Sequence, residues 1–137
     1  MIMSLRIYSD GGARGNPGPS AFAVVVTKGG EILHQHSEYI GINTNNAAEY
    51  RGLIYAVGCA MDMHADEVEF VMDSELVIKQ MCGEYKVKSD NLREMHRDVK
   101  AMTSTIPKVK FTHVRRADRM ITLADSLLNE KLDEHSG

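Results

Sequence analysis

The sequence of 137 residues contains no tryptophan and only two cysteines. It has no apolar run that approaches the ~18 residues of a membrane-spanning helix, and residues 1–6 lack the hydrophobic stretch of a signal peptide. Cys59 and Cys82 do not form the C-x-x-C motif of a zinc or redox site. These absences predict a soluble, cytoplasmic protein in a reducing compartment, whose fold needs neither a disulfide nor a structural metal at this length.

The chain also lacks an excess of basic residues, because 16 lysines and arginines stand against 19 aspartates and glutamates and give a net charge of −3. Proteins that hold nucleic acid by charge alone usually carry a basic excess, so the composition does not indicate that mode of binding. A polyanionic ligand stays possible, because divalent cations held by clustered acids reverse the local sign of the field. The positions of the acids therefore matter more than their number.

Hydrophobic patterning predicts one α/β domain that spans residues 1–137. Three strands come first and are followed by a helix, a strand, two helices, a strand and a closing helix. No linker, internal repeat or low-complexity segment divides the chain. The predicted strands are 5–9, 21–27, 32–40, 67–72 and 108–114, and the predicted helices are 46–63, 74–81, 92–102 and the segment after residue 120.

The stretch 10–19 is predicted to be a loop that places an acid, Asp10, at the end of the first strand and follows it with glycines. A backbone without side chains suits a carboxylate that a metal ion or a polyanion must approach closely. The same composition is also typical of an ordinary turn, so this stretch alone does not decide between the two.

Acids stand at the ends of several predicted elements. Asp10 and Asp73 each follow a strand, and a strand–helix–strand connection ordinarily makes such strands parallel neighbours, ~4.8 Å apart. Glu49 and Asp125 stand in the first turns of two helices, so four carboxylates would meet on one rim of the sheet. Oxygen ligands without histidine or cysteine favour Mg²⁺ or Mn²⁺, and pairs of these ions catalyse in-line phosphoryl transfer.

Each of these acids also has a structural interpretation. Residues 46–49 and 122–125 both match the capping box, in which an acid at the third helical position accepts a hydrogen bond from the cap backbone. Asp73 would in the same way cap the helix that follows it. Four independent caps have no reason to gather on one edge of the sheet, which favours a shared site.

The motifs that carry these acids resemble those of type 1 ribonuclease H. They are YSDGGARGNPGP at 8–19, TNNAAE at 44–49, MDSELV at 72–77, and HVRR at 113–116 with LADSL at 123–127. The resemblance implies a five-stranded mixed sheet of order 3-2-1-4-5 flanked by helices, and an endonuclease that cuts the RNA strand of RNA/DNA hybrids. It implies that two Mg²⁺ or Mn²⁺ ions activate water and stabilise the departing 3′ oxygen, leaving 5′-phosphate and 3′-hydroxyl ends. The implied catalytic and metal-binding residues are Asp10, Glu49, Asp73 and Asp125.

The resemblance also implies a set of substrate contacts. Glu49 would touch a ribose 2′-hydroxyl, the group by which a protein distinguishes RNA from DNA. Turn and cap chemistry is the simpler explanation of the asparagines, and both roles can coexist. The implied substrate-binding residues are Gly11, Gly12, Asn16, Asn45 and Asn46 in the minor groove, Thr44 at a DNA phosphate, and Ser74, Arg115 and Arg116.

Two departures from the family pattern are visible. The basic, tryptophan-bearing protrusion of many bacterial members is missing, so substrate grip would rely on basic residues that are equally typical of a solvated surface. No histidine lies between Val114 and Asp125, so an arginine would replace the family's turnover histidine, and Asp118 competes with Asp125 as the fourth acid. The basic residues in question are Lys79, Lys86, Lys88, Arg115, Arg116 and Arg119.

The sequence leaves two other functions open. One is a structure-specific DNA nuclease on the same fold, and the other is a hybrid-binding module that has lost catalysis. The predicted partner is an RNA/DNA hybrid, bound by a monomer that needs no membrane and no obligate protein partner.

Overall fold

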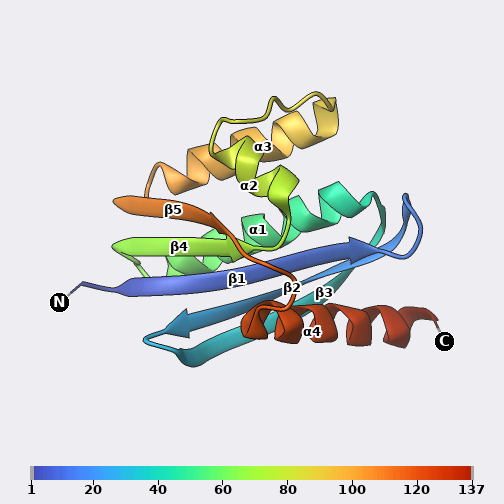
Figure 1. Cartoon of the computed structure of the whole chain (residues 1–137), viewed down its shortest axis with the longest axis horizontal. Helices are drawn as coiled ribbons and strands as arrows, with labels where there is room; N and C mark the ends of the chain where they lie inside the picture. Colours follow the sequence, from blue (N-terminus) through green and yellow to red (C-terminus); the bar gives the residue numbers. More distant parts are fainter. Residues whose placement is uncertain (1, 137) are drawn as a thin grey trace.

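The computed structural model describes residues 2–136 and shows a five-stranded sheet with helices on both faces (Figure 1). The strand order is β3-β2-β1-β4-β5; β1, β2 and β3 are antiparallel neighbours, whereas β4 runs parallel to β1 and to β5. This arrangement confirms the predicted mixed sheet. No helix within residues 2–136 is long and apolar enough to cross a membrane. The strands are β1 (Ser4–Ala13), β2 (Gly18–Lys28), β3 (Glu31–Asn43), β4 (Glu67–Met72) and β5 (Lys108–His113), and the helices are α1 (Asn45–Asp62), α2 (Glu75–Met81), α3 (Asp90–Thr103) and α4 (Arg119–Ser136).

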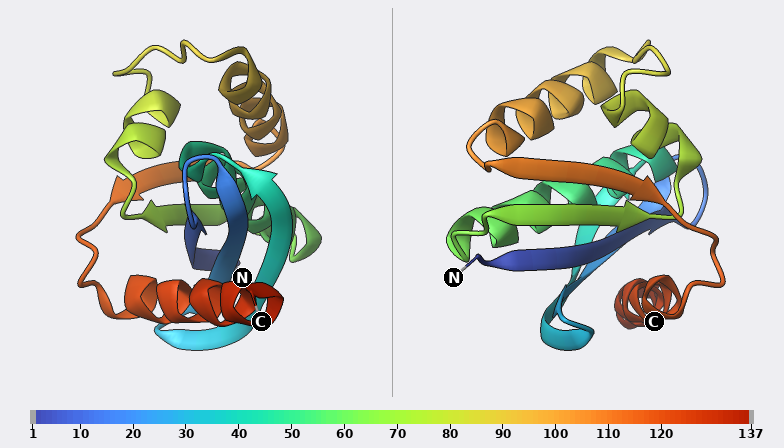
Figure 2. Two further views of the ribbon diagram at one scale, coloured as in Figure 1. Left: turned by 90° about the vertical axis from the view of Figure 1, so that its right-hand side faces the viewer. Right: turned by 60° about the vertical axis from the view of Figure 1, so that its left-hand side comes forward.

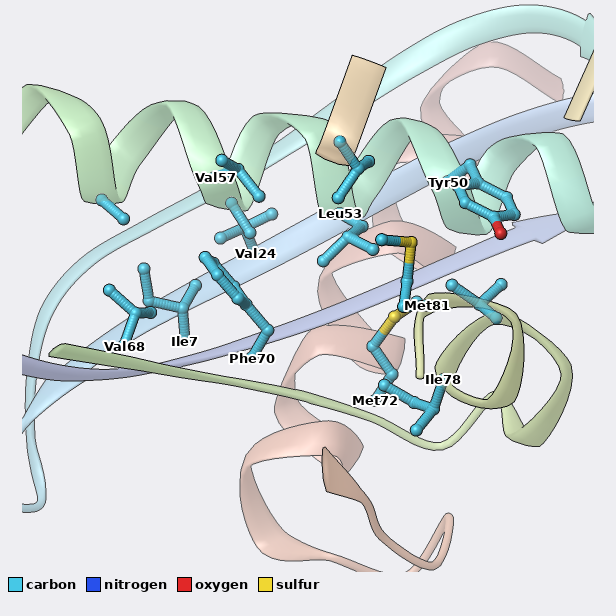
Figure 3. Packing of buried hydrophobic residues seen from close by; sticks show 14 of the residues in the cluster. Ile7, Val24, Tyr50, Leu53, Val57, Val68, Phe70, Met72, Ile78 and Met81 are labelled. Atoms are coloured by element: carbon cyan, nitrogen blue, oxygen red, sulfur yellow. The ribbon is translucent and has the colours of Figure 1, made fainter. Parts of the chain in front are cut away.

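The sheet separates two hydrophobic clusters because successive side chains of a strand point to opposite faces. Ile7 belongs to the cluster under α1, where Figure 3 shows Val24, Leu53 and Phe70 packed between the sheet and the helix. Tyr8 belongs to the smaller cluster under α4, which lies on the opposite face from α1, α2 and α3 (Figure 2). Asp10 follows Tyr8 by two positions and therefore faces the α4 side of the sheet.

The first strand is longer than the sequence predicts, and the loop after it is shorter. β1 continues to Ala13 because it stays paired with β2, in a register that sets Asp10 opposite Ala23. The parallel pairing with β4 ends earlier, at Tyr8 opposite Val71. The prediction of a loop from Asp10 is therefore wrong: this acid lies within a hydrogen-bonded strand, just beyond the end of β4.

Gly11 lets α1 approach the sheet at this point. A Cβ atom built on Gly11 would overlap with the backbone of Ala48 and Glu49. Gly12 has no such restriction, since its Cβ would make an ordinary contact of 3.5 Å with Leu128. The missing side chain of Gly11 thus brings the second turn of α1 against the strand that carries Asp10.

Candidate active site

Asp10 is a buried acid, with only 7% of its surface exposed. Burial raises the pKa of its carboxyl from the ordinary 3.8 to about 8, and the negative charges of Asp73, Asp125 and Glu49 add to the shift. Each of these neighbours comes from a different element or connection, so the fold, rather than local sequence, assembles the four acids. The structure brings together all four carboxylates that the sequence singled out.

Glu49 lies in the second turn of α1, and not in the first turn as the sequence predicts, because the helix begins at Asn45; it is also buried. Its Oε1 accepts a hydrogen bond of 2.8 Å from the side-chain amide of Asn45, whereas its buried Oε2 has no hydrogen-bond partner in the part of the chain that the structure describes. Burial raises the pKa of Glu49 to about 7, and the nearby Ser74 hydroxyl and Asn45 amide oppose this rise. A buried carboxylate oxygen without a partner is costly unless a ligand satisfies it.

The capping interpretation of the acids is wrong, because other side chains cap the helices. Thr44 accepts a hydrogen bond of 3.1 Å from the Ala47 N–H at the start of α1, and Ser74 caps α2 in the same way. Asp118 Oδ1 accepts hydrogen bonds from the N–H groups of Met120 and Ile121 at the start of α4. Glu49, Asp73 and Asp125 therefore do not cap these helices.

A pocket of about 190 Å³ contains the acids. Of the substrate-binding residues expected from the sequence, Gly11, Gly12, Asn45, Ser74 and Arg116 line this pocket. Those that do not line it are Asn16, Thr44, Asn46 and Arg115. Its walls also contain residues that the sequence did not single out, namely Ala13, Arg14, Leu128, Asn129 and Leu132. Asn129 could have been predicted from the sequence, because it follows Asp125 by four residues on a predicted helix and therefore lies on the same side of that helix.

Two asparagines tie the β1–β2 turn to the start of α1. Asn16 Oδ1 accepts a hydrogen bond of 3.0 Å from the Asn45 N–H, and Asn45 Oδ1 accepts one of 3.2 Å from the Ala13 N–H. Asn45 also holds Glu49, as described above. Turn and cap chemistry thus occupies Asn16 and Asn45 and, through them, fixes the orientation of Glu49.

One arginine stands at the mouth of the pocket. Arg116 Nε lies 3.6 Å from Asp73 Oδ2, and its side chain is 91% exposed whereas that of Asp73 is 13% exposed. Such an exposed guanidinium is available to a ligand that reaches the acids. Arg115 is also exposed but does not line the pocket.

A larger hollow of about 500 Å³ lies on the uncovered face of β1, β4 and β5. Four of its charged groups form two ion pairs, Arg6 with Glu69 at 2.7 Å and Lys108 with Glu67 at 3.9 Å. It contains none of the four acids. We therefore consider the smaller pocket as the candidate site, because its two buried acids, Asp10 and Glu49, form no ion pair within residues 2–136.

Comparison with known proteins decides the family. A family model described as reverse transcriptase-like matches residues 8–130. The chain is 39% identical over 128 residues to ribonuclease HI of Halobacterium salinarum. It superposes with a TM-score of 0.89 and 42% identity on the crystal structure of LC11-RNase H1 in complex with an RNA/DNA hybrid, covering 97% of this chain and 99% of that one. The chain belongs to the type 1 ribonuclease H family.

Another ribonuclease H neighbour is the N-terminal RNase H domain of Rv2228c from Mycobacterium tuberculosis, with a TM-score of 0.92, 38% identity and coverage of 98% of this chain and 96% of that one. The full-length curated relatives are longer. The alignment covers 96% of this chain but 36% of the bifunctional protein Rv2228c, and 93% of this chain but 63% of the Halobacterium enzyme. These matches confirm the family and the fold that the sequence motifs indicated.

In this chain, residues 82–89 connect α2 directly to α3. Lys79 forms an ion pair of 3.0 Å with Glu75 and lies 5.1 Å from the centre of the Tyr85 ring. Lys86 and Lys88 border a groove of about 580 Å³ beside Tyr85, away from the acids. No basic protrusion stands between the two helices.

The four acids of the ribonuclease H motifs line one pocket, but their carboxylates do not surround a common point at which a metal ion could bind. Within residues 2–136, no three acid, histidine or cysteine side chains already form a metal-ligand group. Mutual repulsion between like charges favours such an open arrangement. Any shared cation would have to draw the carboxylates together.

Proposed function

We propose that this chain is a metal-dependent endonuclease that hydrolyses the RNA strand of RNA/DNA hybrids, with residues 1–137 forming one catalytic domain. The observation that carries the proposal is the buried Asp10 carboxylate, which shares a pocket with Glu49, Asp73 and Asp125. The similar LC11-RNase H1 was crystallised with an RNA/DNA hybrid, which supports this choice of substrate.

The donor set fits two Mg²⁺ or Mn²⁺ ions. The pocket offers carboxylate, amide and hydroxyl oxygens and no histidine or cysteine among its lining residues, and Glu49 Oε2 is a buried oxygen without a hydrogen-bond partner among the described residues. Bound there, the cations would supply activation of water and stabilisation of the leaving 3′ oxygen, giving 5′-phosphate and 3′-hydroxyl products. The residues that would hold them are Asp10, Glu49, Asp73 and Asp125.

The chain's own residues would orient the substrate. Glu49, whose carboxylate accepts a hydrogen bond from Asn45 and faces the pocket, would recognise a ribose 2′-hydroxyl. Arg116 and Ser74 border the acids and would contact the strand that is cut. Gly11 and Gly12 line the pocket and would lie against the minor groove of the hybrid. The other predicted contacts, at Asn16, Thr44, Asn46 and Arg115, would lie along the hybrid outside the pocket.

The experiment that tests this function compares three labelled duplexes of one sequence: RNA/DNA hybrid, DNA and RNA. Each is incubated with the protein in Mg²⁺, in Mn²⁺ and in EDTA. We expect cleavage of the hybrid's RNA strand in either metal and none in EDTA, with 5′-phosphate ends on the products. Cleavage of DNA but not of the hybrid would show a DNA nuclease, and hybrid binding without cleavage would show an inactive binding module.

We also infer that the protein acts in the cytoplasm as a monomer without an obligate protein partner. Light scattering of the purified protein, alone and with hybrid, tests the monomer, since a mass twice that of the chain would contradict it.

A further inference from the structure

Arg14 links the β1–β2 turn to α4 at one end of the acid pocket. Its Nη2 lies 2.7 Å from Asp133 Oδ1 and 3.3 Å from Asn129 Oδ1. Its backbone N–H donates a hydrogen bond of 2.8 Å to the carbonyl of Pro19, which fixes the base of the side chain. The guanidinium is therefore held from the turn onto the surface of α4.

The partners of Arg14 share one side of α4 with an acid of the pocket. Asp125, Asn129 and Asp133 are spaced at i, i+4 and i+8, which places them in a row along the helix. The Asn129 side-chain amide donates a hydrogen bond of 2.9 Å to the Asp125 carbonyl. Arg14 thus contacts the two residues that follow Asp125 in this row, Asn129 and Asp133.

The ion pair between Arg14 and Asp133 is not needed to hold α4. Their side chains are 41% and 69% exposed, and ion pairs at such exposure contribute little to stability. The helix is already fixed by apolar side chains packed against the sheet. These are Ile121, Ala124, Leu128 and Leu132, all of them buried. A different role for an arginine at this position is therefore open.

The pocket has a guanidinium on each side. Arg116 stands beside Asp73, and Arg14 stands on the α4 side beyond Asp125. A planar guanidinium binds phosphate with two parallel hydrogen bonds, an interaction stronger than an exposed pair with a single carboxylate oxygen. A nucleic-acid strand whose phosphate reaches the acids would carry its next phosphates toward these two arginines.

We propose that Arg14 binds a backbone phosphate of the hybrid beside the acid pocket, and that Asp133 holds its guanidinium in place until substrate arrives. This proposal rests on the hybrid-cleaving function proposed above. Arg14 is a substrate-binding residue that exchanges one anionic partner for another. Asp133 competes with the substrate for it.

The test measures KM and kcat for cleavage of a labelled RNA/DNA hybrid by four variants and the unaltered protein. Arg14→Gln raises KM about tenfold with kcat unchanged, and lowers the slope of log KM against log salt by ~0.7–0.9. Asp133→Asn lowers KM about twofold because Arg14 loses its competing partner. In the double variant Arg14→Gln/Asp133→Asn, KM equals that of Arg14→Gln alone.

Glu130→Gln is the matched control, because it removes the same charge from α4 without touching Arg14. It leaves KM unchanged, and an effect as large as that of Asp133→Asn would overturn the holding role of Asp133. A fall in kcat with unchanged KM in Arg14→Gln would show that Arg14 positions α4 and would overturn the proposal. If the unaltered protein does not cut the hybrid at all, the proposed function itself is wrong.

Discussion

Asp118 and Asp125 stand at the same end of α4, but their carboxylates have different surroundings. Asp118 accepts two backbone N–H groups at the helix start, whereas Asp125 faces the pocket and contributes to the raised pKa of Asp10. The helix cap therefore distinguishes Asp125, the fourth acid predicted from the sequence, from its competitor Asp118. It favours Asp125 as the fourth acid of the site.

A set of substitutions tests this assignment. Asp125→Asn should lower kcat at least about a hundredfold with the melting temperature maintained, because it withdraws a metal ligand and not a packing group. Asp118→Asn should leave both quantities close to those of the unaltered protein, since asparagine caps helices as well as aspartate does. Asp118→Ala should cost ~1 kcal/mol of stability, measured by urea unfolding. A larger loss of kcat in Asp118→Asn than in Asp125→Asn would reverse the assignment.

At the residue scale, the four acids could be predicted because each stands near the end of an element whose type the local pattern reveals. Arg14 could not be assigned a partner in this way. Its contact with Asn129 joins residues 115 positions apart, and nothing near Arg14 in the sequence indicates α4. Asn16 and Asn45 showed turn and cap chemistry in the sequence, but their link to Glu49 depends on how the turn packs against α1.

Among the elements, the contact between β1 and α1 sets the position of Glu49 relative to Asp10. Gly11→Ala should destabilise the protein by ~1–3 kcal/mol or more and lower cleavage, because the new methyl group forces α1 away from the strand. Gly12→Ala is the control on the same strand, since its methyl group would find ordinary contacts. Urea unfolding measures both. Equal stability of the two variants would show that α1 can shift without cost.

The order and type of the elements could be predicted from hydrophobic periodicity, but several of their ends could not. β1 runs four residues into the predicted loop, to Ala13, because β2 supplies its hydrogen-bond partners, and no local pattern reports such pairing. Thr44, and not Asn46, caps α1, because both residue types favour this position and the packing of the helix decides between them. These corrections leave the acids on one rim and place Asp10 within a strand that is paired with β2.

Over the whole molecule, the net charge of −3 conceals a concentration of acids in one pocket. The pKa of Asp10 is about 8 in the folded state against an ordinary 3.8, and that of Glu49 is about 7 against 4.5. At a pH between the ordinary and the raised pKa of each group, the folded protein therefore binds more protons than the unfolded chain does. By linkage, stability in EDTA falls as pH rises from about 4 to about 8.

Thermal unfolding in EDTA across this pH range checks the electrostatic account. Asp10→Asn should reduce the fall in melting temperature, and at pH 8 it should melt about 3–5 °C above the unaltered protein, the shift that ~1 kcal/mol gives at this size. Mg²⁺ should raise the melting temperature of the unaltered protein more than that of Asp10→Asn, because a ligand of the folded state stabilises it. A steeper pH dependence in Asp10→Asn would contradict the burial of a charged carboxylate at this position.

We propose that the rim of acids around Asp10 is the metal-dependent site at which the RNA strand is cut. The most direct test is the single-turnover rate of hybrid cleavage in Mg²⁺ by the unaltered protein and by Asp10→Asn, both shown to be folded by circular dichroism. The structure predicts a loss of at least about a hundredfold in the variant. Cleavage of the hybrid by Asp10→Asn at the rate of the unaltered protein would contradict the claim and place the active site elsewhere.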